Sequence, residues 1–385
     1  GDEKAMRAFT PPSLAHQFSD GTINKLPKGA SLKQARNNYI KLLEKKGFFD
    51  PNKPTLLFIH GDQPTLTAKR KRIDFCYSYL LANNKQLAVI NTANGWKGWN
   101  VGMFYWNQFA DDVQGKGISD FVRAITWPEM KIYSSKNKAG MRWAYLDSKG
   151  HSQFCYRGKK NCIGLPLDSH GYQQSVRQLA YEAYINAFPK GYNQRIRISG
   201  QSLGTQLAVQ LTGYISNNHH VPQPSQLILL DPYFTPGLHH LDVGGGNDSA
   251  ADYNYQVASH FLKENPKLGF SIYRTTKLSE WPTGDRNKPL ENLSAYLRIC
   301  PAFLKNANKK VQTVAEHISC GYIYFHSKKF PAPTHFVNAS STAEDVIKLM
   351  GTKRYCNLTN FKAGCQRVST KPIHCRLESR FFKIH

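Results

Sequence analysis

The chain has 385 residues, of which 41% are hydrophobic and 12% aromatic, an ordinary composition for a globular enzyme with one large buried core. No apolar run approaches the ~20 residues that a membrane-spanning helix needs, which excludes such a helix. The 51 basic and 26 acidic side chains give a formal net charge of +25, which favours contact with anionic surfaces.

The cysteine content indicates an oxidising compartment. Eight cysteines are many for a cytosolic enzyme, and none forms a C-x-x-C pair, so zinc-ribbon and thioredoxin-like sites are excluded. The close spacing of Cys155 with Cys162, and of Cys356 with Cys365, predicts loops closed by disulfides. We therefore expect a secreted or extracytoplasmic protein. N-glycosylation sequons at Asn292, Asn338 and Asn357 fit secretion.

Within the first hundred residues, a polar N-terminal segment is followed by the predicted beginning of an α/β domain. Residues 55–60 form an apolar run that meets Gly61, which is typical of a buried parallel strand ending in a tight turn. The other elements predicted here are helices at 30–46 and 72–81 and strands at 86–91 and 100–106.

From residue 173 onward, helices and strands alternate, which predicts a mostly parallel sheet with helices on both faces. The strand at 195–199 carries two alternating arginines, Arg195 and Arg197, which is unusual for a strand covered on both faces. The elements predicted in this half are helices at 173–188 and 203–215 and strands at 195–199, 226–230 and 268–273.

The chain is therefore divided into three parts. Residues 1–53 form a polar, proline-punctuated N-terminal extension, and residues 54–350 form the α/β domain. Residues 351–385 form a short tail with three cysteines, in which basic residues outnumber the single acidic residue, Glu378.

The segment Gly200-Gln201-Ser202-Leu203-Gly204 lies between a predicted strand and a predicted helix. In that context the pattern G-x-S-x-G is typical of a nucleophile elbow, a turn so tight that the serine is strained and glycines relieve the crowding. The N–H groups that begin the following helix would face the developing negative charge. We therefore predict Ser202 to be a catalytic nucleophile.

Three motifs in this order resemble the α/β-hydrolase superfamily, and within it the pancreatic-type lipases: the runs at 58–61, 200–204 and 229–232. The resemblance covers roughly residues 54–330. It implies an α/β-hydrolase fold and a triad in the chain order serine, aspartate, histidine. It departs from pancreatic-type lipases at the C-terminus, where too few residues remain for their β-sandwich.

The triad acid implied by the resemblance is Asp231, which ends the strand at 226–230. At the carboxyl edge of a parallel sheet its side chain would lie where ligands bind. The alternative is that Asp231 only caps the turn before Pro232. Glu280 and Asp285, which follow the next strand, are competing acids.

Two histidines compete for the role of base, which takes the proton of the serine. His317, with Glu316 before it and Ile318 after it, resembles the lipase segment in which the catalytic histidine opens a helix. His335 lies in a loop before a predicted helix at 342–350. We favour His317 and keep His335 as the alternative.

The oxyanion hole is expected to use the backbone N–H of Leu203 and, by resemblance, that of Asp62. Lipases usually carry an apolar residue at the second position. A carboxylate beside an oxyanion is repulsive unless it points away or is paired, so Asp62 is a departure from the family pattern.

No metal and no cofactor is expected. The acids at 241–254 fit no calcium motif, and the adjacent histidine pairs lack partner ligands. That loop after the acid strand could instead form a flap, and the segment 280–310 is where a lipase-like lid would lie. An aromatic run at 96–109 is expected to line an acyl pocket or to pack in the core.

The function predicted is a serine hydrolase of carboxylic esters, most specifically a lipase or phospholipase acting on lipid acyl esters. Basic clusters at 69–72 and 157–160 would bring it to an anionic membrane surface. No nucleic acid is expected, because no helix-turn-helix, finger or RNA-recognition pattern is present. The alternative is a catalytically silent lipase-fold protein that docks on anionic surfaces.

Overall fold

The computed structural model describes residues 49–62, 98–104, 106–112, 118–136, 141–146, 152–155, 174–237, 249–280 and 282–300. It also describes several short strands and the helical residues 313, 316, 317 and 320. The extension 1–48, the clusters 69–72 and 157–160, and the tail apart from Arg376–Leu377 lie outside the described residues, so the predictions made for them stay predictions.

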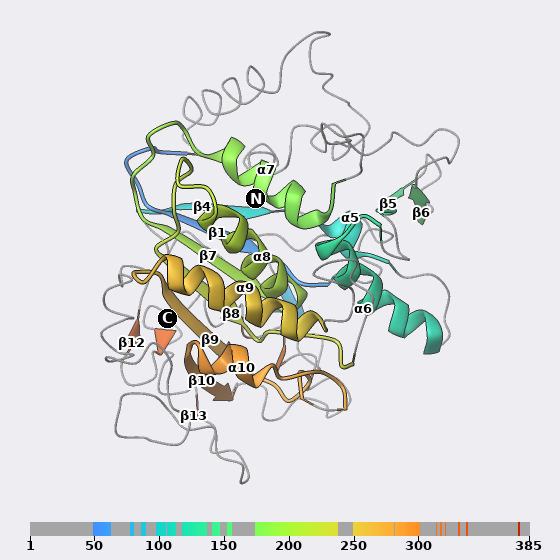
Figure 1. Cartoon of the computed structure of the whole chain (residues 1–385). Helices are drawn as coiled ribbons and strands as arrows, with labels where there is room; N and C mark the ends of the chain where they lie inside the picture. The colour runs from blue at the N-terminus through green and yellow to red at the C-terminus, as the bar shows by residue number, and fades with distance from the viewer. Residues whose placement is uncertain are drawn as a thin grey trace.

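A parallel sheet organises the described chain (Figure 1). Its strands lie in the order β13-β10-β9-β8-β7-β1-β4, and every neighbouring pair is parallel. The prediction of an α/β fold with a mostly parallel sheet is confirmed. The strands are β1 (Thr55–Ile59), β4 (Asn100–Phe104), β7 (Ile196–Gln201), β8 (Gln226–Leu230), β9 (Gly269–Arg274), β10 (Ala295–Cys300) and β13 (Arg376–Leu377).

Three helices lie side by side across one face of this sheet (Figure 1). The central one, α8 (Leu203–Ser216), packs on β7, β8 and β1 and is buried along nearly its whole length. It is flanked by α7 (Val176–Ala187) and α9 (Ala250–Glu264). The remaining helices are α5 (Asn107–Ala110), α6 (Ile118–Tyr133) and α10 (Lys288–Asn292).

Short antiparallel pairs complete the described elements. They are β2 (Ser78–Leu80) with β3 (Gln86–Val89), β5 (Trp143–Leu146) with β6 (Ser152–Cys155), and β11 (Phe330–Pro331) with β12 (Phe336–Val337).

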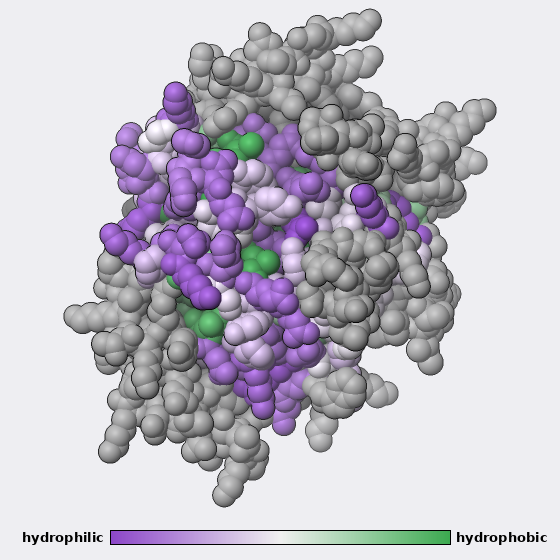
Figure 2. Space-filling view, in the orientation of Figure 1, coloured by the Kyte–Doolittle hydropathy of each residue, from purple (hydrophilic) through white to green (hydrophobic). Residues whose placement is uncertain are grey.

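The strands β1, β7, β8 and β9 are buried at every position, so both faces of the sheet are covered there. Phe104, Trp106 and Phe109 from the aromatic run are almost fully buried, so these three rings pack in the core. Figure 2 shows the helix-layer side, where hydrophilic side chains predominate. Within the described ranges, no helix is both long and apolar enough to cross a membrane.

Three sequence predictions need correction. The end of the helix predicted at 72–81 is strand β2 instead. The end of the loop predicted at 241–254 begins helix α9, capped by the Ser249 side chain, which accepts from the N–H of Asp252. In the segment considered as a lid, the described residues form α10 and β10, and β10 is an integral strand of the sheet.

Arg197 of β7 and Arg195, which precedes the strand, both have an aromatic partner. The guanidinium carbon of Arg197 lies 5.1 Å from the ring centroid of Trp99, and that of Arg195 lies 5.5 Å away. The attraction between the indole face and the two guanidinium groups thus offsets part of the free-energy cost of removing these charges from water.

Candidate functional site

Ser202 occupies the turn between β7 and α8 in a backbone conformation that few non-glycine residues adopt. Its φ is 55° and its ψ is −127°. The N–H of Ser202 donates to the carbonyl oxygen of Leu230 at 3.1 Å, which ties this turn to the end of β8. Backbone strain of this kind persists only where the surroundings enforce it, and it clusters at functional sites.

Two glycines allow the chain to close tightly around Ser202. A Cβ atom at Gly204 would lie 2.3 Å from the carbonyl oxygen of His60, so only glycine lets α8 approach the end of β1. A Cβ atom at Gly61 would lie 2.6 Å from Ser202 Cβ and 3.2 Å from Ser202 Oγ. The turn after β1 therefore lies directly against the predicted nucleophile.

Asp231 and His317 are brought together, although they lie far apart in the sequence. His317 Nδ1 is 2.6 Å from Asp231 Oδ2, and Asp231 is fully buried. A carboxylate only accepts hydrogen bonds, so Nδ1 carries the proton and the lone pair is on Nε2. The second carboxylate oxygen, Oδ1, accepts from the N–H of Thr275 at 3.1 Å.

Further contacts hold the His317 segment beside Ser202. The side chain of Gln201, the residue before Ser202, donates from Nε2 to the carbonyl oxygen of His317 at 3.1 Å. Thr275 Oγ1 donates to the carbonyl oxygen of Glu316 at 2.7 Å. The Tyr233 ring meets the imidazole edge-on, with centroids 6.5 Å apart. Neither Gln201, Thr275 nor Tyr233 was singled out from the sequence, because nothing local to them indicates a histidine that follows so much later in the chain.

His60 fixes the turn that follows β1. Its Nδ1 donates to the carbonyl oxygen of Gly61 at 2.8 Å, and its Nε2 accepts from the N–H of Trp106 at 3.2 Å. The indole N–H of Trp106 in turn donates to the carbonyl oxygen of His60 at 2.8 Å, and the two rings stack. Burial lowers the pKa of His60 to about 4, so the imidazole is neutral in this pair of contacts.

The two predicted oxyanion donors belong to the start of α8 and to the turn after β1. Leu203 is the first residue of α8, so its N–H has no acceptor within the helix. Asp62 follows Gly61 in the turn against Ser202 and is half-buried. Burial lowers the pKa of Lys131 to about 7, and the charges of Asp111 and Asp62 oppose this effect. Lys131 Nζ itself pairs with the buried carboxylate of Asp112.

The loop after Asp231 is anchored to the helix layer by a buried carboxylate. Glu129 on α6 accepts from the N–H of Thr235 at 3.0 Å and from Gln206 Nε2 at 2.7 Å. The side chain of Gln206 also donates to the carbonyl oxygen of Tyr233 at 2.7 Å. These contacts fix the course of the chain directly after the predicted acid.

The two competing acids lie elsewhere. Glu280 and Asp285 line a hollow of about 620 Å³ formed by the loops after β8 and β9, whereas Asp231 holds the imidazole of His317. His335 lies outside the described residues. The hollow is also lined by Pro236, Gly237, Gly284, Arg286, Asn287, Lys288 and Pro289.

Within the described ranges, no group of three or more histidine, cysteine or acidic side chains is arranged to hold a metal ion. His219 and His220 are exposed at the end of α8. Cys320 is a free, buried thiol whose Sγ points to the carbonyl oxygen of Tyr273, and burial raises its pKa well above the ordinary value. The side chains of the other seven cysteines are outside the described part, so the disulfide prediction stays a prediction.

Chemically, this arrangement offers a hydroxyl on a strained turn, an imidazole oriented by a carboxylate, and backbone N–H groups at a helix start. Those are the parts that nucleophilic acyl transfer uses. Ser202, Asp231 and His317 come from the ends of β7 and β8 and from a helical segment beyond the sheet.

No protein-family model matches the chain, and no curated protein matches it. Among solved structures, the crystal structure of the lin2722 gene product from Listeria innocua is 11% identical, with a TM-score of 0.29, over 71% of this chain and 94% of that one. RedJ, solved with a PEG molecule bound in its active site, is 12% identical, with a TM-score of 0.26, over 70% of this chain and 93% of that one. At such TM-scores neither likeness bears on the chemistry of this chain.

Proposed function

We propose that this protein is a serine hydrolase of carboxylic esters with an α/β-hydrolase fold. The observation that carries the proposal is the 2.6 Å hydrogen bond between Asp231 and His317 at the edge of the sheet where Ser202 occupies its strained turn. A buried carboxylate that fixes the tautomer of an imidazole orients the base that takes the proton of a serine during attack.

In the proposed mechanism, Nε2 of His317 accepts the hydroxyl proton of Ser202 as Oγ attacks the ester carbonyl carbon. Asp231 stabilises the imidazolium that forms. The N–H groups of Leu203 and Asp62 donate to the oxyanion of the tetrahedral intermediate. The imidazolium then protonates the departing alcohol, and water repeats the sequence to release the acid and free Ser202.

The substrate class that we propose is a lipid acyl ester, including phospholipids. Support comes from the net charge of +25, which raises the rate of encounter with an anionic bilayer. The resemblance of the runs at 58–61, 200–204 and 229–232 to pancreatic-type lipases points the same way. Action outside the cytoplasm, inferred from the cysteine content, belongs to the same proposal.

The test compares hydrolysis of p-nitrophenyl butyrate and of anionic phospholipid vesicles by wild type, Ser202→Ala and Ser199→Ala. Ser199 is a matched control, because it is buried on β7, the strand that leads into Ser202, and its hydroxyl makes no hydrogen bond in the described part. We expect Ser202→Ala to lower kcat by about 10⁴-fold or more and Ser199→Ala to retain it. Wild type that binds vesicles but hydrolyses neither ester would contradict the proposal and favour a docking protein.

A further inference from the structure

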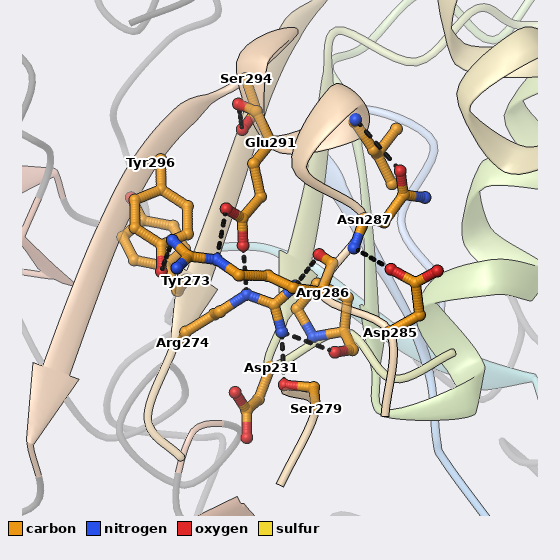
Figure 3. Close-up of polar contacts among 12 residues, drawn as sticks. Asp231, Tyr273, Arg274, Ser279, Asp285, Arg286, Asn287, Glu291, Ser294 and Tyr296 are labelled. Carbon is orange, nitrogen blue, oxygen red and sulfur yellow. Dashed lines mark hydrogen bonds and ion pairs between the residues drawn. The ribbon is translucent and has the colours of Figure 1, made fainter. Parts of the chain in front are cut away.

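Arg274 ends β9 and carries a fully buried guanidinium (Figure 3). Its Nε donates to Glu291 Oε1 at 2.5 Å, and its Nη1 donates to Ser279 Oγ at 2.5 Å. Its Nη2 donates to the carbonyl oxygen of Arg286 at 2.5 Å. A buried guanidinium with this many acceptors is held in one orientation, because Nε and both terminal nitrogens of its planar fork donate.

The remaining hydrogen bond of Arg274 is to the residue that follows the predicted acid. Nη1 also donates to the carbonyl oxygen of Pro232, directly after Asp231, at 2.9 Å. The residues on either side of Arg274 bind Asp231 itself. The carbonyl oxygen of Tyr273 accepts from the N–H of Asp231 at 2.6 Å, and Thr275 donates to Oδ1. Asp231 and the residue after it are thus both held by Arg274 and its immediate neighbours.

Asp231 needs such support because its φ is 47°, a backbone conformation that is strained for a residue other than glycine. The side chain must leave this strained backbone at one angle to meet Nδ1 of His317. Releasing the carbonyl oxygen of Pro232 would let the chain after Asp231 relax.

The charge of Arg274 is compensated locally. Burial alone would lower the pKa of Arg274, but the carboxylates of Glu291 and Asp231 are among the groups that raise it above its ordinary value. Glu291 is itself fully buried, and its second oxygen accepts from Arg286 Nε at 2.8 Å. Arg274 therefore stays charged, and its attraction to Asp231 acts on the same carboxylate that binds His317.

We infer that Arg274 is a positioning residue that holds Asp231 in the conformation in which its carboxylate orients His317. The inference rests on the proposed function for its effect on catalysis, although the effect on the Asp231–His317 hydrogen bond is independent of turnover. Arg274 touches neither the substrate nor the reacting atoms in this account. It acts through the carbonyl oxygen of Pro232 and through the flanking residues of β9.

Two variants test this. Arg274→Lys keeps a cation beside Glu291 but cannot supply the planar fork that reaches Pro232, Ser279 and Arg286 together. The double variant Arg274→Met/Glu291→Leu replaces the buried ion pair with apolar groups and leaves no fully buried charge unpaired, a change that folded proteins often tolerate. Arg286→Gln is the matched control, because it removes the second cation on Glu291 without touching Pro232.

Two readouts separate positioning from general loss of structure. The first is the split of kcat from KM, for which we expect Arg274→Lys and the double variant to lower kcat by about tenfold to 100-fold at similar KM. The second is the proton NMR signal of His317 Nδ1–H, which a hydrogen bond to a carboxylate moves far downfield. We expect this signal to weaken or shift in both variants and to persist in Arg286→Gln. Circular dichroism and Tm identify folded variants.

The inference is overturned if folded Arg274→Lys, or the folded double variant, keeps the wild-type kcat and the wild-type Nδ1–H signal. Equal losses in Arg286→Gln would also overturn it, because they would assign the effect to Glu291. Should wild type show no turnover, the proposed function fails, and the NMR comparison still decides whether Arg274 positions Asp231.

Discussion

Acidification should destabilise the protein through His60, the imidazole that fixes the turn against Ser202. Burial lowers its pKa from 6.5 to about 4, so the unfolded chain binds a proton more readily than the folded chain in this interval. The stability that neutral His60 contributes is therefore fully present above pH 6.5 and is lost as the pH falls toward 4. Between pH 7.5 and pH 5 the loss is about 2 kcal/mol, from 1.36 kcal/mol per pKa unit.

The assay is urea unfolding of wild type and His60→Gln at pH 7.5 and pH 5, followed by tryptophan fluorescence. Glutamine does not titrate, and its carbonyl oxygen can replace Nε2 as the acceptor for the N–H of Trp106. Carboxylates that protonate in both proteins cancel in the comparison. Wild type should lose about 2 kcal/mol more than His60→Gln over this interval. Equal losses in the two proteins would refute the assignment of a neutral, buried imidazole.

Two further perturbations test the site and its packing. Asp231→Asn should lower kcat by about 10³- to 10⁴-fold at similar KM, because an amide nitrogen in place of Oδ2 favours the wrong imidazole tautomer. A kcat within tenfold of wild type would contradict the role of Asp231. Gly204→Ala should lower the free energy of unfolding in urea by about 3 kcal/mol or more, since its Cβ would lie 2.3 Å from the backbone of His60. In the control Gly213→Ala the new methyl group meets only the movable side chain of Val257. Equal costs in the two variants would contradict the tight contact between α8 and β1.

The elements that sequence predicted well are those with strong local patterns. The buried strands β1, β7 and β8 are continuous apolar runs or end at glycine motifs, and α8 follows directly from one of them. Asp231 follows from the end of β8 once the sheet is parallel, because carboxyl ends of neighbouring parallel strands meet at one edge. Local pattern and topology therefore predicted where Ser202 and Asp231 lie, whereas the role of Asp231 as an acid was implied by the resemblance to lipases.

What the sequence could not supply depends on contacts between distant segments. The choice of His317 over the competitors needs the observed 2.6 Å approach to Asp231, and no spacing rule gives that distance. Strand β10 was overlooked because Arg298 interrupts its apolar pattern. Arg274 appears in sequence as an ordinary charged residue after a strand, and only its burial among acceptors at the end of β9 distinguishes it.

The central claim, that Ser202 is an activated nucleophile, is tested most directly by covalent labelling with a fluorophosphonate probe. Peptide mass spectrometry would locate the adduct in wild type, Ser202→Ala and Ser199→Ala, each assayed with and without anionic phospholipid vesicles. We predict an adduct on Ser202 in wild type and in Ser199→Ala, and none in Ser202→Ala. Folded wild type that takes up no label under either condition, or label on another serine, would contradict it.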